Sequence, residues 1–105
     1  MKKEDQQKEN LVVLEEFKAL EDALPTFRYL GDIDFIRLRS CNAKVGVFND
    51  YTILVSYSTV VAFIKDDKLY DVLRYNYGYT ATSAKHIAKF AHDYDVKERY
   101  TWREL

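Results

Sequence analysis

The longest run of apolar, β-branched and aromatic residues covers positions 51–64 and contains no glycine, proline or charged residue. In its first half Ile53 and Val55 alternate with hydroxyl and leucine side chains, as in an extended chain. Positions 60–64 are apolar throughout, which is typical of a strand covered on both faces. Because a usual strand has about five or six residues, the run predicts two strands, or one strand sharply bent at positions 58–59, at the centre of a sheet.

The first 24 residues show a helical period rather than an alternating one. Apolar residues recur every three or four positions and form one stripe, while acidic residues occupy much of the remainder. The stripe consists of Leu11, Leu14, Phe17, Leu20 and Leu24. Pro25 ends the predicted helix because proline cannot continue the hydrogen-bond ladder. The first ten or so residues are polar, and we expect them to be frayed.

Short apolar segments on both sides of the central run predict the rest of the sheet. They cover residues 27–30 (a strand or a lead-in), 33–39, 45–48 and 69–76, with 65–68 as a hairpin connection. Strands joined by such short turns are antiparallel.

A second helix is predicted to begin near Thr82 or Ser83, either of which could act as its N-cap. Its apolar stripe places Ala84, Ile87, Ala88 and Ala91 inward, and leaves Lys85, Lys89 and His92 in water. The tail, residues 97–105, is predicted to form a short strand or to pack Tyr100 and Trp102 onto the body.

The order of elements is helix, strands, helix, which indicates the α+β class. We expect residues 1–105 to form one domain, an antiparallel sheet of four to five strands flanked by an N-terminal helix and a C-terminal helix. With both helices on one face, the other face would carry tyrosine, threonine and arginine side chains.

Composition narrows the possible functions. The 105 residues carry 16 Lys/Arg against 17 Asp/Glu, so no bulk positive charge favours nucleic-acid binding. The single cysteine and the hydrophilic start of the chain predict a cytoplasmic protein, with no membrane segment. Nine tyrosines in a small domain indicate either well-covered sheet faces or a contact surface.

The residues that could support catalysis are few and scattered. Cys41 lies in a predicted turn, and His86 and His92 are six positions apart on one predicted helix, so they do not face a common point. The three glycines, 31, 46 and 78, are isolated and form no phosphate-binding loop. We therefore expect no enzyme, no metal site and no cofactor.

A group of aromatic and basic residues is the strongest candidate for a site. If residues 74–79 are extended, Tyr75, Tyr77 and Tyr79 project to one side beside a cation. Such a surface could anchor a protein partner, stack single-stranded bases, or simply pack against the protein's own helix. The candidate partner-binding residues are Arg74, Tyr75, Tyr77, Tyr79, Lys85, His86, Arg37 and Arg39, the last two joining if the open sheet face carries them.

Residues 54–64, with the sequence LVSYSTVVAFI, and residues 75–90, with Tyr79-Thr-Ala-Thr-Ser-Ala-Lys-His-Ile87 and Phe90, carry a family resemblance. They resemble small uncharacterised proteins of phages and mobile elements in Gram-positive bacteria, over about residues 45–92. In size and architecture the chain is also similar to small type II-A anti-CRISPR proteins, which are non-enzymatic inhibitors of an RNA-guided effector nuclease.

The resemblance implies a phage-type inhibitor that works in the host cell cytosol by binding a host defence protein, in particular a CRISPR effector nuclease or its guide complex. The alternative is a small nucleic-acid-binding accessory or regulatory protein of a phage or plasmid that uses the same aromatic surface. A structural or oligomeric phage component is a third possibility.

Overall fold

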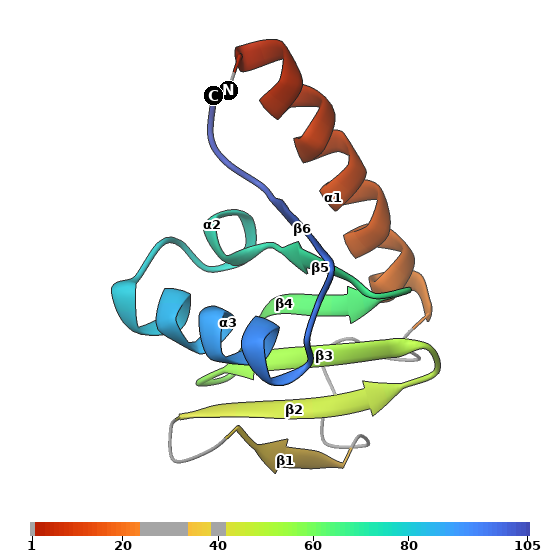
Figure 1. The fold of residues 1–105 in the computed structure, drawn as a ribbon, viewed down its shortest axis with the longest axis vertical. Coiled ribbons are helices and arrows are strands. Elements are labelled where there is room, and N and C mark those ends of the chain that lie inside the picture. The colour runs from red at the N-terminus through yellow and green to blue at the C-terminus, as the bar shows by residue number, and fades with distance from the viewer. Residues whose placement is uncertain (1, 24–33, 39–41) are drawn as a thin grey trace.

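The computed structural model describes residues 2–23, 34–38 and 42–105, and the chain has an α+β fold (Figure 1). The described elements are, in chain order, α1 (Lys3–Ala23), β1 (Phe35–Arg37), β2 (Ala43–Phe48), β3 (Tyr51–Ser56), β4 (Thr59–Lys65), β5 (Lys68–Asp71), α2 (Leu73–Asn76), α3 (Ala81–Asp93) and β6 (Glu98–Thr101). No helix among these is long and apolar enough to cross a membrane.

The six strands form one sheet in the order β1-β2-β3-β4-β5-β6. The first five strands are antiparallel neighbours, as their short turns predict. The tail adds a sixth strand, β6, which runs parallel to β5. It is parallel because the chain returns to the same end of the sheet through α2 and α3 before β6 begins. The expected purely antiparallel sheet of four to five strands is therefore corrected to a mixed sheet of six.

The central run forms two strands, as one of the two sequence interpretations expected. Tyr57 and Ser58 turn the chain between β3 and β4. Next to this turn the register shifts, so that Val55 pairs with Val60 while Leu54 pairs with Ala62. Val61 is thus an extra residue in β4, and the bulge increases the local twist.

The sheet is covered on both faces, each by a different helix. On one face α1 packs Val13, Phe17 and Leu20 against a cluster that contains Phe63. On the other face α3 packs Ile87 and Phe90 against a cluster that includes Leu54, Val61 and Leu69; Figure 1 shows this helix lying across β3 and β4. The expectation that both helices share one face is wrong, because β3 and β4 bury apolar side chains on both sides and each side needs cover.

The buried face of α1 differs from the predicted leucine stripe. Its buried residues are Gln6, Asn10, Val13, Phe17 and Leu20. Leu11, which the stripe included, is 59% exposed. The helix is rotated because its N-terminal half packs polar side chains against the tail of the chain instead of apolar ones against the sheet.

These polar side chains close the outer edge of β6. The Gln6 side chain donates to the Thr101 carbonyl at 3.0 Å, and the Thr101 N–H donates to the Glu9 carboxylate at 2.8 Å. The Asn10 amide donates to the Arg103 carbonyl at 2.6 Å and accepts from the Arg103 N–H at 2.9 Å. Alternate residues of an edge strand point their main-chain groups outward, so α1 takes the place of a neighbouring strand.

The segment after β5 leaves the sheet earlier than its aromatic pattern indicates. Asp71 ends the strand: its carboxylate accepts the Leu73 N–H at 3.1 Å and an Arg99 hydrogen bond at 2.9 Å. The chain then turns into α2, so the strand predicted for residues 69–76 continues only to Asp71.

The second long helix begins earlier than expected, and the set of residues that it buries differs from the prediction. Thr80, not Thr82 or Ser83, is the N-cap, and its hydroxyl accepts the Ser83 N–H at 3.1 Å. Ile87 is buried as predicted, but Ala88 is exposed, because the helix turns Ser83, His86 and Phe90 inward instead.

Several predicted features lie outside the described residues. They are Leu24 and Pro25 at the predicted helix end, the segment 27–30, Arg39 and Cys41.

The Phe63→Ala substitution should be severely destabilising. Phe63 is fully buried, and its ring lies 5.2 to 6.1 Å from those of Tyr70, Tyr51 and Phe17. Removing a buried phenylalanine lowers the free energy of unfolding by about 3–5 kcal/mol. Urea denaturation followed by circular dichroism measures it, with Val47→Ala, at a 65% exposed position of β2, as the control. Equal midpoints for the two variants would contradict this placement.

The Asn10→Ala substitution should lower the free energy of unfolding by about 1–3 kcal/mol, because it leaves the main-chain groups of Arg103 without their side-chain partner. Leu11→Ala, one position along and exposed, should change it little. The same denaturation experiment compares them. An Asn10→Ala protein as stable as Leu11→Ala would show that α1 does not hold the tail.

Candidate contact surface around α2

The segment that carries half of the predicted site residues is short and firmly anchored. Leu73 is buried, and the Asn76 side chain donates to the Val60 carbonyl at 2.8 Å. The N–H groups of Tyr77 and Gly78 both donate to the Leu73 carbonyl. Gly78 then turns the chain with a φ of +112°, a conformation that other residues rarely adopt. The segment therefore presents its side chains from a fixed backbone.

Three tyrosines of this segment are half-exposed: Tyr75 at 50%, Tyr77 at 50% and Tyr79 at 55%. They do not form the expected row on an extended strand, because Tyr75 belongs to α2 and the other two follow it in a turn. Tyr75 packs edge-on against Phe17 and Trp102. Tyr77 makes no ring contact with the part of the chain that the structure describes. The half-exposed Tyr77 ring therefore takes no part in the aromatic contacts of the described chain.

Arg74 lies over the Tyr79 ring, with its guanidinium carbon 4.4 Å from the ring centre. These two residues line a hollow of about 380 Å³ together with Arg103 and Glu104 from the tail. No ion pair joins either arginine to an acidic side chain among residues 2–23, 34–38 and 42–105. We call Arg74, Tyr75, Tyr77, Tyr79 and Arg103 the tyrosine–arginine surface.

Arg103 was not among the predicted site residues. Its position depends on a tail that returns beside α1, where Asn10 holds both of its main-chain groups. Trp102, which packs on Tyr75, also lies behind this surface. The basic and aromatic composition of residues 97–105 could have indicated a contact residue in the tail. Nothing local in the sequence indicated which element the tail would lie beside.

The two predicted residues from α3 have different surroundings. Lys85 is exposed, and it is not among the residues that line the hollow beside Arg74. His86 is only 4% exposed, so the expectation that it contributes to a contact surface is corrected: its ring is turned into the protein.

His86 belongs to a buried polar cluster that connects α3 to the end of β3. The Ser56 hydroxyl lies 2.9 Å from His86 Nδ1 and 2.9 Å from the Ser83 hydroxyl. Ser56 and Ser83 are 1% and 0% exposed, so a substrate could not reach either hydroxyl. The cluster therefore pairs polar groups inside the core. Sequence reasoning missed it, although Ser83 and His86 are spaced to share one helix face.

Burial lowers the pKa of His86 below its ordinary value of 6.5, and the positive charge of Lys89 adds to this effect. The neutral imidazole can accept a hydrogen bond from Ser56 at Nδ1, whereas the protonated ring cannot. The folded protein thus favours neutral His86.

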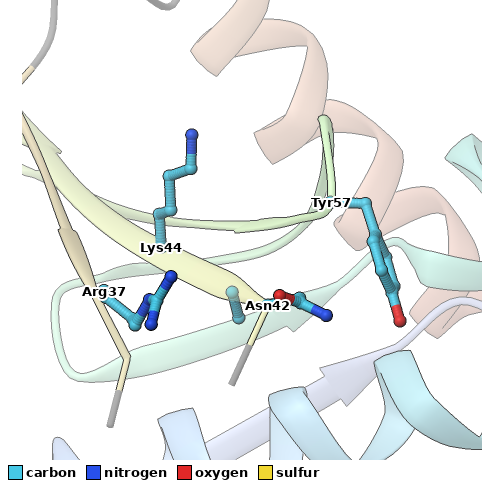
Figure 2. Close-up of a pocket in the computed structure, with 5 residues that line it drawn as sticks. Arg37, Asn42, Lys44 and Tyr57 are labelled. Carbon is cyan, nitrogen blue, oxygen red and sulfur yellow. The ribbon is translucent and has the colours of Figure 1, made fainter. Parts of the chain in front are cut away.

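Arg37 lies away from the tyrosine–arginine surface. It is on β1, which is at the opposite edge of the sheet from β6. There it lines a smaller hollow with Asn42, Ala43, Lys44 and Tyr57 (Figure 2). Arg39 lies outside the described residues. The predicted set of site residues is therefore divided between two edges of the sheet.

Within residues 2–23, 34–38 and 42–105, no group of three or more His, Cys, Asp or Glu side chains is placed to bind a metal ion.

The stability of the protein should fall as the pH drops through the ordinary histidine range. The folded-state pKa of His86 lies below its unfolded value, so its contribution is fully present above about pH 6.5 and is lost as the pH falls below it. From about pH 7.5 to about pH 5.5, the melting temperature of wild type should fall more than that of His86→Gln. His92→Gln, at an exposed position, should follow wild type. Parallel curves for wild type and His86→Gln would contradict a buried neutral ring.

Comparison with known proteins gives one result, at the level of the family. No curated protein and no solved structure matches the chain significantly. Residues 37–104 match a family of unknown function, DUF8033. The match begins at the last residue of β1 and ends in the tail beyond β6, so it includes β2 to β6, α2 and α3, whereas α1 precedes it. The chain belongs to the family of unknown function DUF8033.

Proposed function

We propose that the protein is a non-enzymatic binding protein that contacts a protein partner through the tyrosine–arginine surface. The observation that carries this proposal is a short, anchored segment that holds three half-exposed tyrosines and an arginine outside the core. Tyrosine and arginine are the residue types that most often anchor protein interfaces.

The fixed backbone supports the proposal because binding then orders little additional chain. Tyr77 and Gly78 are held by hydrogen bonds to Leu73, and the Arg74 side chain rests on Tyr79. Immobilising a flexible side chain at an interface costs about 0.5–1.5 kcal/mol. Side chains that are already held avoid part of this entropy loss, so more of the contact energy stabilises the complex.

The charges of this surface favour an acidic group on the partner. Arg74 and Arg103 line one hollow, and the described residues supply no ion pair to either. Guanidinium groups bind carboxylates in a paired, planar geometry. An aspartate or glutamate of the partner would fill the hollow between them, with Glu104 limiting how much negative charge it accepts.

The resemblance in sequence and size supplies the first partner to test, an RNA-guided effector nuclease or its guide complex. The alternative, binding of nucleic acid at this same surface, receives less support. Single-stranded bases stack on successive aromatic rings along a groove or sheet, and here Tyr75 is packed against Trp102 and Phe17 while Tyr77 and Tyr79 lie on a turn.

Tyr77→Ala should weaken binding without weakening the fold. The ring is half-exposed and makes no aromatic or cation–π contact in the described chain, so its loss should change the melting temperature little. As an interface anchor it should contribute about 2 kcal/mol or more, which is near thirtyfold in affinity. Arg74→Ala should also reduce affinity. Biolayer interferometry with the immobilised nuclease–guide complex measures both.

Tyr94→Ala is the matched control, because Tyr94 is 46% exposed on the far end of α3. It should bind like wild type once its melting temperature has been checked, since its ring packs on Phe90. Full binding by folded Tyr77→Ala and Arg74→Ala proteins would place the contact surface elsewhere. If wild type does not bind the complex, the same variants are compared in pull-downs from a Gram-positive host lysate.

A further inference from the structure

We propose that a hollow between α1 and α2 binds a basic side chain, an arginine or a lysine, of the same protein partner. This α1–α2 hollow measures about 350 Å³. It is lined by Leu14, Phe17, Lys18, Glu21, Asp22 and Tyr75. The inference rests on the proposed function, because the hollow shares Tyr75 with the tyrosine–arginine surface.

One face of α1 forms a wall of the hollow, because its lining residues recur at spacings of three and four positions. On the other side Tyr75 of α2 meets Phe17 edge-on, with ring centres 6.2 Å apart. Phe17 belongs to the core, whereas Leu14 is half-buried and Tyr75 is 50% exposed. The hollow therefore has an apolar floor that an occupant can reach, and a methylene chain can be buried on it.

The rim of the hollow carries two acids in a position that is unfavourable for the protein alone. Glu21 and Asp22 are exposed and lie in the last turn of α1, which contains no basic residue. The carbonyl groups at the C-terminal end of a helix carry partial negative charge, so carboxylates there are repelled. No ion pair joins either acid to a basic side chain within residues 2–23, 34–38 and 42–105. A cation in the hollow turns this repulsion into attraction.

Lys18 lies on the same rim and offsets one of the two negative charges. It is exposed and precedes the acids by three and four positions, an order in which a helical lysine–acid pair is weaker than in the reverse order. The two acids and the helix end still leave the hollow negative. The hollow beside Arg74 and Arg103, in contrast, is positive.

The charge and the apolar floor together select a basic side chain. An acidic side chain is repelled, and a purely apolar one takes water from Glu21 and Asp22 without replacing its hydrogen bonds. Arginine and lysine combine a methylene stem for the floor with N–H donors for the carboxylates. Arg74 and Tyr75 are neighbours in α2 and each lines one of the two hollows, so a single partner can reach both. The partner then offers an acid to one hollow and a base to the other.

The first experiment needs no partner protein. Nuclear magnetic resonance follows the isotope-labelled full chain during titration with acetyl-arginine methylamide at millimolar concentrations. The citrulline analogue, which has the same length and no charge, is the control ligand. The arginine compound should shift the amide signals of Glu21, Asp22 and Tyr75, and the citrulline analogue should bind at least about threefold more weakly. Absence of these shifts, or equal affinity for the two compounds, would overturn the inference.

Charge variants separate a binding role from a structural one. Glu21→Gln/Asp22→Asn should weaken binding of the arginine compound about threefold or more. Lys18→Gln, which removes the competing cation, should strengthen it. Glu4→Gln/Asp5→Asn, the same charge change in the first turn of α1, should bind like wild type. The melting temperature should rise for the last-turn variant and fall for the first-turn variant, because the two pairs of acids lie at opposite ends of the helix dipole. Unchanged arginine affinity or a lower melting temperature in the last-turn variant would contradict the assignment.

Binding to the nuclease–guide complex then separates this inference from the proposed function. If Tyr77→Ala and Glu21→Gln/Asp22→Asn both weaken binding, the second by about threefold or more, both proposals are supported. If only Tyr77→Ala weakens it, the partner uses the tyrosine–arginine surface without the α1–α2 hollow, and this inference alone is overturned. If wild type does not bind the complex, that partner is excluded, and the arginine titration decides the hollow by itself.

Discussion

The β3–β4 hairpin buries apolar side chains on both of its faces, and the other elements are arranged around this requirement. Ile53, Val55 and Phe63 face α1, whereas Leu54, Val61 and Ala62 face α3. Each Å² of apolar surface that stayed in water would deprive the fold of roughly 25 cal/mol of stabilisation. One helix cannot cover two faces of a sheet, so one helix lies on each side, and the α2–α3 connection that carries the tyrosines follows from this arrangement.

Local patterns in the sequence indicate the strands well and the arrangement of the helices poorly. The two-sided hairpin, the turns after Phe48 and Lys65 and the existence of both long helices follow from alternation, polar turn residues and the 3.6-residue period. The rotation of α1 does not, because Gln6 and Asn10 are buried by a tail about 90 residues away. The end of β5 was also missed, because Asp71 acts through side-chain hydrogen bonds that periodicity does not contain.

For the candidate site, the structure shows where the predicted residues lie. The sequence indicated tyrosines and arginines as contact residues, and Tyr75, Tyr77 and Tyr79 are half-exposed. It does not keep the set together: Arg37 is at the other edge and His86 is inside the core. A net charge of −1 gives no indication of the hollow beside Arg74, where two arginines from segments far apart in the sequence lie together with Glu104.

The contacts between α1 and the tail have a consequence for the order in which the chain folds. The β2–β3–β4 meander joins residues that are close in sequence, so it can form with little loop-closure entropy. Asn10 and Arg103 are 93 positions apart, and their hydrogen bonds require β5, α2, α3 and β6 to be in place first. The hydrogen bonds between the polar side of α1 and the tail therefore form late in folding. Weakening them should speed unfolding and change the folding rate of the sheet little.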